Sequence, residues 1–185
     1  RSLSLAAESC KTSMDYISRG NRGELPMEKM IVIDYDKCIG CKTCETVCSL
    51  THERRVSPAA ARITVAKYEP TGINVPMLCQ KCEDPICLAV CPMKAIALDP
   101  LLGTRIDHAR CIGCKMCVLA CPIGGVSLHP TKGEIIMCDL CQGDPQCVRL
   151  CPQQALEYLD ASLLSAKKRR DSVRKLLGLV EGVGT

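Results

Sequence analysis

Short apolar runs rich in Val and Ile recur along the chain, separated by polar stretches in which cysteine is frequent. One run, Met30-Ile31-Val32-Ile33-Asp34, stands directly before a cysteine-rich stretch, and Glu134-Ile135-Ile136-Met137 stands before the last such stretch. Short β-branched runs favour strands, because helices need longer periodic segments. We therefore predict strands before and after cysteine loops, at residues 30–34, 63–68, 95–98, 105–107, 125–128 and 134–137.

The two ends of the chain depart from this pattern. Residues 1–29 hold no strong apolar period, so we expect an N-terminal extension that becomes ordered in a complex, with Cys10 as a free thiol. Apolar residues near heptad spacing predict a helix over residues 162–180, within a C-terminal tail of residues 161–185. We interpret its basic face as the solvated side of a surface helix that docks on a partner.

Cysteine takes the place that aromatic residues hold in most protein interiors. The 185 residues include no Phe, no Trp and four Tyr, but 17 Cys. Aromatic side chains usually dominate core burial, so we expect cysteine to fill part of this interior. All cysteines except Cys10 fall into four blocks: block 1 is Cys38, Cys41, Cys44 and Cys48; block 2 is Cys79, Cys82, Cys87 and Cys91; block 3 is Cys111, Cys114, Cys117 and Cys121; block 4 is Cys138, Cys141, Cys147 and Cys151.

Block 3 has the spacing of a bacterial iron–sulfur loop. Cys111, Cys114 and Cys117 are separated by two residues each, and Cys121 follows after three more and precedes a proline. A C-x2-C-x2-C loop wraps three thiolates around one cluster, whereas the fourth cysteine ligates a neighbouring cluster. Blocks 2 and 4 also end in Cys-Pro, and block 1 has Ser49 in place of the proline. Four blocks of four predict four [4Fe-4S] clusters.

Two other uses of dense cysteine fit less well. A disulfide scaffold would leave one thiol over, because the count is odd, and the close pairs recur in regular blocks. Zinc sites use C-x2-C pairs, but a third cysteine two residues on and a proline after the fourth are not typical of a zinc ribbon. A zinc-dependent interaction module stays open as an alternative, and a colourless, iron-free protein would favour it.

The net charge of +4 does not indicate a nucleic-acid partner once clusters are counted. A cubane held by four thiolates carries about −2, so four clusters would bring the holoprotein to about −4. No apolar run is long enough for a membrane span or a secretory signal, and reduced cysteines are typical of the cytoplasm. We expect a cytoplasmic protein with no transmembrane segment and no nucleic-acid partner.

The gaps between blocks bear on which blocks pair. Residues 92–110 and 122–137 give gaps of 19 and 16 residues, whereas residues 49–78 give a gap of 30. If blocks 2 and 3 pair, blocks 1 and 4 must pair around them. The alternative, block 1 with block 2 and block 3 with block 4, places the long gap inside one module. We favour the nested arrangement.

The nested arrangement predicts an α+β fold of two dicluster ferredoxin-like modules with an N-terminal extension and a C-terminal helix. The outer module comprises residues 30–74 and 130–160, and the inner module comprises residues 75–129. The predicted ligand sets are Cys38, Cys41, Cys44 and Cys151 for cluster one; Cys138, Cys141, Cys147 and Cys48 for cluster two; Cys79, Cys82, Cys87 and Cys121 for cluster three; and Cys111, Cys114, Cys117 and Cys91 for cluster four.

The sixteen block cysteines, over residues 30–158, resemble the four-cluster ferredoxin subunits that accompany molybdenum, tungsten and hydrogenase enzymes, including the iron–sulfur subunit of dimethyl sulfoxide reductase. The resemblance implies the same nested pairing and a cubane in every site. Val75-Pro76 before Cys79-Gln80-Lys81-Cys82-Glu83-Asp84-Pro85, the segment Cys138-Asp139-Leu140-Cys141-Gln142-Gly143-Asp144-Pro145 and the basic C-terminal helix are similar to the small polyferredoxin of tungsten aldehyde oxidoreductases and tungsten benzoyl-CoA reductases. The same segments also resemble hydrogenase and formate hydrogenlyase ferredoxin subunits.

The resemblance implies an electron-transfer subunit in a hetero-oligomer. Its expected partner is a large catalytic subunit, a tungsten or molybdenum pterin oxidoreductase, with a flavin subunit or a ferredoxin completing the circuit. The alternatives are a subunit of a hydrogenase or formate dehydrogenase complex and a free soluble polyferredoxin. The sequence contains no nucleophile–base pair and no phosphate loop, so we expect no catalytic site of its own.

Several residues beside the ligands have two interpretations. Ile39 and Ile112 either exclude water from a cluster or belong to an ordinary core, and Lys42 and Lys115 either raise a cluster potential or are solvated loop charges. The three histidines are expected to be surface or capping residues: His52, His108 and His129.

Overall fold

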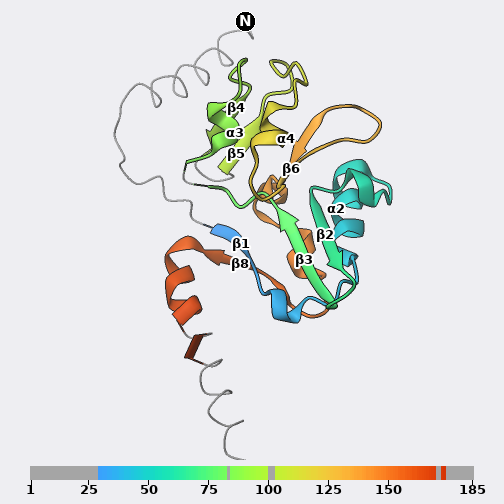
Figure 1. Ribbon diagram of the computed structural model, residues 1–185, viewed down its shortest axis with the longest axis vertical. Helices are drawn as coiled ribbons and strands as arrows, with labels where there is room; N and C mark the ends of the chain where they lie inside the picture. Colours follow the sequence, from blue (N-terminus) through green and yellow to red (C-terminus); the bar gives the residue numbers. More distant parts are fainter. Residues whose placement is uncertain (1–28, 83, 100–102, 170–171, 174–185) are drawn as a thin grey trace, which may run out of the picture.

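Short strands and short helices alternate along the described part of the chain, and the expected mixture of the two is confirmed (Figure 1). The computed structural model describes residues 29–82, 84–99, 103–169 and 172–173. The strands are β1 (Lys29–Ile33), β2 (Ile63–Tyr68), β3 (Ile73–Leu78), β4 (Ile96–Asp99), β5 (Gly103–Ile106), β6 (Val126–Leu128), β7 (Ile135–Met137) and β8 (Leu156–Asp160). The helices are α2 (Thr43–Glu53), α3 (Ile86–Ala89), α4 (Met116–Ala120) and α5 (Gln146–Arg149), with 3-10 turns η1 (Tyr35–Lys37), η2 (Pro58–Ala60), η3 (Leu140–Gly143) and η4 (Ala161–Leu163). Every predicted strand is present within about two residues of its expected bounds, as is usual for boundaries read from sequence.

The strands pair two by two, and one pair joins the two ends of the described chain. β1 pairs antiparallel with β8, with Ile31 opposite Tyr158, so the strand before block 1 lies beside the strand after block 4 (Figure 1). The other described sheets pair neighbours in sequence: β2 with β3, β4 with β5 and β6 with β7. A two-stranded sheet has little stability of its own, so these sheets depend on what packs between them.

The length of α2 follows from the missing proline in block 1. α2 begins after Lys42 and ends at Arg54, both of which have left-handed backbone conformations (φ 60° and 53°). In the other blocks a proline follows the fourth cysteine, and α3, α4 and α5 have only four or five residues. Ser49 continues α2 instead, so block 1 presents Cys44 and Cys48 on one helix.

Two apolar clusters form the interior, and cysteines belong to both. Cys44, Cys48, Cys138 and Cys147 pack with residues of β1, β2, β3 and β8, whereas Cys87 and Cys117 pack with residues of β4, β6 and β7. These six side chains are 7–9% exposed, so the prediction that cysteine fills part of the interior is confirmed. Cys79 packs against both clusters and lies where they meet.

The loop residues beside the ligands are more exposed than a core role allows. Ile39 and Ile112 border cysteine-lined cavities but are 59% and 64% exposed, so the ordinary core interpretation is wrong. Their role in excluding water at the rim of a cluster stays a prediction. Lys42 and Lys115 are exposed, which favours solvated loop charges because water screens such groups.

Two of the three histidines are more buried than a surface position allows. The side chain of His52 is only 12% exposed, and His129 is 1% exposed. The Nδ1 of His129 accepts the backbone N–H groups of Thr131 and Lys132 at 3.3 and 3.1 Å, so its capping interpretation agrees with the structure. His108 is exposed as expected.

The two ends of the chain are only partly described. Residues 164–169 and 172–173 are helical and fall within the predicted C-terminal helix. The rest of that helix lies outside the described residues, as does the N-terminal extension up to residue 28, with Cys10. Among the helices that the structure describes, none has both the length and the apolar character needed to cross a lipid bilayer.

Candidate iron–sulfur centres

One backbone feature recurs in all four cysteine loops. The residue directly before the second cysteine has a left-handed conformation, with φ between 53° and 69°. The four residues are Gly40, Lys81, Gly113 and Leu140. Glycine adopts this conformation freely, whereas a residue with a side chain loses about 1 kcal/mol there. The loop fold is therefore shared by all blocks, including the two with longer spacers.

A second feature recurs at the fourth cysteine of blocks 2, 3 and 4. The sulfurs of Cys91, Cys121 and Cys151 each accept a backbone N–H from the residue four positions later, at 3.2–3.3 Å. The residue three positions later is left-handed in each case and turns that N–H towards the sulfur; these residues are Lys94, Gly124 and Gln154. An N–H donated to a ligating sulfur favours its anionic form and tunes the potential of a bound cluster.

Block 1 obtains the same sulfur hydrogen bond in another way. Because α2 continues past Cys48, the N–H four residues later is not turned towards the sulfur. The backbone N–H of Arg62 donates to the Cys48 Sγ instead, at 3.2 Å. Arg62, which lies outside block 1, thus provides the N–H donor that the turn after Cys-Pro provides in the other blocks.

Three cavities are each lined by four cysteines, three from one block and one from another. The first cavity holds Cys38, Cys41, Cys44 and Cys151; the second holds Cys138, Cys141, Cys147 and Cys48; the third holds Cys111, Cys114, Cys117 and Cys91. Most other lining residues are apolar, such as Leu156, Ile63 and Ile135. Each cavity therefore offers four thiols in largely apolar surroundings.

Three of the remaining four block cysteines lie in one apolar cluster. These three are Cys79, Cys87 and Cys121, and Cys82 is exposed. The N–H of Gly125 donates to the Cys121 Sγ, and Gly125 itself lies directly against the backbone of Cys79. The structure thus brings the end of block 3 against the start of block 2.

The spread of the cysteines separates iron–sulfur from zinc chemistry. Tetrahedral zinc with Zn–S bonds near 2.3 Å places its sulfurs about 3.8 Å apart. Among the described residues, the one set of three candidate ligand atoms within 4.8 Å of one another is His52, Asp139 and Cys141, which contains a single sulfur. The cysteine quartets are therefore spread too widely for one zinc ion, whereas a cubane holds its four thiolates around a larger body.

Burial sets the protonation state of several ligands before metal binds. Burial raises the pKa of the Cys44 and Cys138 thiols to about 12 and that of Cys87 to about 11. The hydroxyl of Thr43 donates to the exposed Cys41 Sγ at 3.4 Å and lowers its pKa. Iron binds thiolates, so cluster assembly has to release protons from the buried thiols.

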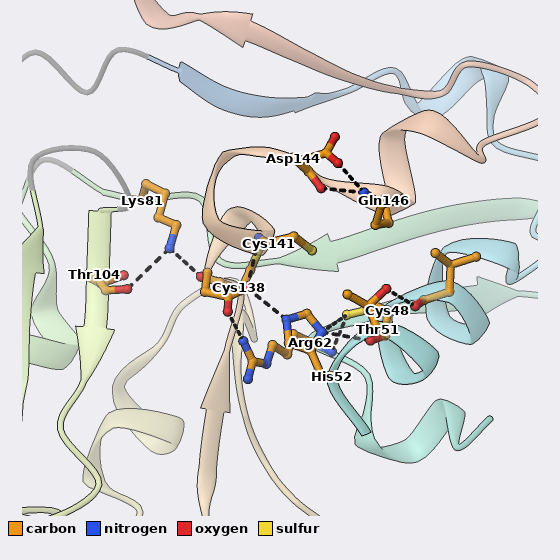
Figure 2. Close-up of polar contacts among 12 residues, drawn as sticks. Cys48, Thr51, His52, Arg62, Lys81, Thr104, Cys138, Cys141, Asp144 and Gln146 are labelled. Atoms are coloured by element: carbon orange, nitrogen blue, oxygen red, sulfur yellow. Dashed lines mark hydrogen bonds and ion pairs between the residues drawn. The ribbon is translucent and has the colours of Figure 1, made fainter. Parts of the chain in front are cut away.

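A polar network borders the cavity that contains Cys48 (Figure 2). The Nδ1 of His52 lies 2.8 Å from the Cys48 carbonyl oxygen and 3.7 Å from its Sγ, and Nε2 lies 3.1 Å from the Asp139 carboxylate. Because both ring nitrogens face oxygen acceptors, both donate and the ring is an imidazolium. The hydrogen bond to Asp139 raises the pKa of His52 to about 10.

Asp139 ties α2 and the chain after it to the loop of block 4. Its carboxylate accepts from His52, from the Arg62 guanidinium and from the Cys141 N–H at 3.0 Å. Burial acts to raise the pKa of Asp139, but the hydrogen bond from His52 and the charge of Arg62 outweigh it and hold that pKa well below its usual range. This cavity therefore has two cations and one anion at its edge.

Two family models match the chain, and together they include all sixteen block cysteines. A 4Fe-4S dicluster domain matches residues 71–161, and a 4Fe-4S binding domain matches residues 30–52. Over residues 71–161 the chain is therefore similar to 4Fe-4S dicluster domains. These matches bear out the expected cofactors, four [4Fe-4S] clusters.

The chain is also similar to several curated proteins. The polyferredoxin-like subunit of the aliphatic sulfonate oxidoreductase of Pyrococcus furiosus is 46% identical over 85 residues, 45% of this chain and 49% of that protein. The electron transport protein HydN and formate hydrogenlyase subunit 2 of Escherichia coli are each 36% identical over 96 residues, covering 48% and 49% of this chain and 53% and 43% of those proteins. The chain spans about half the length of the curated relatives it matches. One of these relatives, HydN, is an electron transport protein.

Solved structures of the BamBC active site complex of benzoyl-CoA reductase also match. In the complex with benzoyl-CoA the matching chain is 26% identical, with a TM-score of 0.45, over 79% of this chain and 96% of that chain. In the complex with zinc the identity is 23% and the TM-score 0.44, over 85% and 98%. TM-scores below 0.5 support no conclusion about the fold.

Gly125→Ala is expected to damage the protein at the Cys79–Cys121 contact. The added Cβ would lie 2.6 Å from the Cys79 Cα and 2.7 Å from its backbone N, atoms that cannot rotate away. We expect the free energy of unfolding to fall by about 3 kcal/mol. We also expect less iron to be bound per chain. Anaerobic denaturant unfolding with iron analysis measures both. In Gly133→Ala the Cβ meets nothing within 4 Å, so only the left-handed cost of about 1 kcal/mol is expected; equal losses in the two variants would contradict the steric explanation.

Proposed function

We propose that this protein is an electron-transfer subunit that relays single electrons through four [4Fe-4S] clusters to or from the active site of a larger redox enzyme. The observation that carries the proposal is the set of three apolar cavities, each lined by three cysteines of one block and one of another. When bound, each cluster stores one electron at a time. The chain's own residues hold the ligands, exclude water and donate N–H groups to the sulfurs.

We propose the ligand sets and nested modules stated from the sequence. Cavity lining supports clusters one, two and four, and the packing of Cys79, Cys87 and Cys121 supports cluster three. The pairing of β1 with β8 supports an outer module of residues 30–74 and 130–160 around an inner module of residues 75–129. In Figure 1, α3, β4, β5 and α4 gather at one end, and β1 and β8 lie side by side away from them.

The proposed partner is the large catalytic subunit of a tungsten or molybdenum pterin oxidoreductase, with a flavin subunit or a ferredoxin completing the circuit in the cytoplasm. The motifs around Cys79 and Cys138 support this choice, and so does the identity of 46% to a subunit of an aliphatic sulfonate oxidoreductase. The second candidate is a hydrogenase or formate dehydrogenase complex. It is favoured by the identity of 36% to HydN and to formate hydrogenlyase subunit 2.

Anaerobic purification of the tagged full chain from its native host tests the partner. We expect it to elute in a hetero-oligomer whose large subunit contains tungsten or molybdenum. Nickel in the attached subunit would move the assignment to a hydrogenase. A monomer on gel filtration that exchanges electrons with many donors would identify a free polyferredoxin instead.

A further inference from the structure

Lys81 is a buried cation that reaches from block 2 to block 4 (Figure 2). It lies directly before Cys82 and is 4% exposed. Its Nζ donates to the carbonyl of Cys138 and, at 3.4 Å, to the carbonyl of Thr104 on β5. Thr104 is 2% exposed, and its hydroxyl lies 3.3 Å from the Cys79 Sγ. One ammonium group therefore stands beside ligands of two different quartets.

The backbone conformation at position 81 is unfavourable for a lysine. Lys81 has a φ of 53°, and the equivalent residues of blocks 1 and 3 are Gly40 and Gly113. A lysine costs about 1 kcal/mol more than glycine in this conformation, and burying an ammonium group adds a desolvation cost. The hydrogen bonds from the ammonium group to two backbone carbonyl oxygens offset these two costs.

We propose that Lys81 is a positioning residue for electron transfer between the two modules, because its charge raises the reduction potentials of clusters two and three together. This inference rests on the ligand sets of the proposed function, in which Cys138 serves cluster two and Cys79 serves cluster three. An added electron makes a cluster more negative, so a nearby cation stabilises the reduced form. Because both potentials rise together, the difference between these two clusters changes little, and both clusters accept an electron more readily.

The burial of Lys81 distinguishes it from exposed lysines such as Lys132. Lys132 lies in the turn between β6 and β7, outside the cysteine loops, and its side chain is 49% exposed. Charges in water are screened within about 10 Å, whereas a buried charge acts on its neighbours with little screening. Lys132 therefore offers a control with the same charge in water and no place in a cysteine loop.

Redox titration of the full-length holoprotein, followed by electron paramagnetic resonance, tests the proposal in the variant Lys81→Gln. Glutamine keeps N–H donors for the two carbonyls but removes the charge. For two of the four one-electron steps, we expect the ratio of reduced to oxidised cluster at a fixed potential to fall at least tenfold. A tenfold fall corresponds to a reduction potential lower by about 59 mV. The potentials of the other two steps should change by less than a third of that amount, and so should every step in Lys132→Gln.

Unchanged steps in Lys81→Gln with full iron content would overturn the proposal, and so would a shift confined to one step. If Lys81→Gln loses iron, Lys81→Arg decides the matter because it keeps the charge. All four steps are then expected at wild-type potentials, and two lowered steps in Lys81→Arg would contradict the role of charge. Wild-type protein with far fewer than about sixteen irons would contradict the proposed function instead, so the two failures are distinguished.

Discussion

Stripping iron and sulfide from the protein is expected to unfold the chain between about residue 29 and residue 160. The four described sheets are two-stranded, and α3, α4 and α5 have four or five residues, so none is stable alone. The interior has no Phe or Trp, and cysteines that would lose their metal stand in both apolar clusters. Metal binding and folding are therefore one process in this protein.

Far-UV circular dichroism and amide hydrogen exchange measure this unfolding. In the stripped chain we expect loss of most regular secondary structure, and protection of the β1 and β8 amides reduced to less than tenfold. Anaerobic reduction of the intact protein is the control, because it changes the charge of the clusters and leaves every ligand in place. Retained protection of β1 and β8 after complete removal of iron would show that the polypeptide folds without its clusters.

Removing Cys121 is expected to cost one intact cubane, and a second substitution identifies which cubane it is. In the proposed sets Cys121 and Cys79 share cluster three, so Cys121→Ala and the double variant Cys79→Ala/Cys121→Ala should both keep about three cubanes. Cys138 serves cluster two, so Cys121→Ala/Cys138→Ala should keep only about two. Mössbauer spectroscopy of iron-57 protein counts intact cubanes and separates them from clusters that have lost one iron.

The other pairing of blocks gives the opposite pattern. If block 3 paired with block 4, Cys121 and Cys138 would share a cluster, and their double variant would keep about three cubanes. Gly125 stands four residues after Cys121 and lies in close contact with the Cys79 backbone. This contact is the structural reason to expect the nested result.

The sequence was informative about strands and cysteine spacing because both are local signals. β-branched runs beside each block predicted the strands, and the odd cysteine count with C-x2-C-x2-C spacing predicted the cluster chemistry. The length of α2 was not foreseen, although Ser49 in place of a proline is a local signal that the helix continues. The left-handed backbone of Lys81 and Leu140 was also missed, because glycine marks this position in only two of the blocks.

The polar surroundings of the centres could not be predicted in the same way. His52 and Asp139 are 87 positions apart, and Arg62 and Asp139 are 77 apart, so only the folded chain brings them together. His52 was expected to be a surface or capping residue, because it stands outside the cysteine blocks. Lys81 carries a local signal, its place between two ligands, but its burial depends on Cys138 and Thr104 from distant segments.

The most direct test of the account is the iron and acid-labile sulfide content of anaerobically prepared and reconstituted full-length protein. Sixteen cysteines arranged as four quartets predict about sixteen irons and about sixteen sulfides per chain. A content near eight of each, or zinc in place of iron, would contradict the claim that this chain is a four-cluster electron carrier.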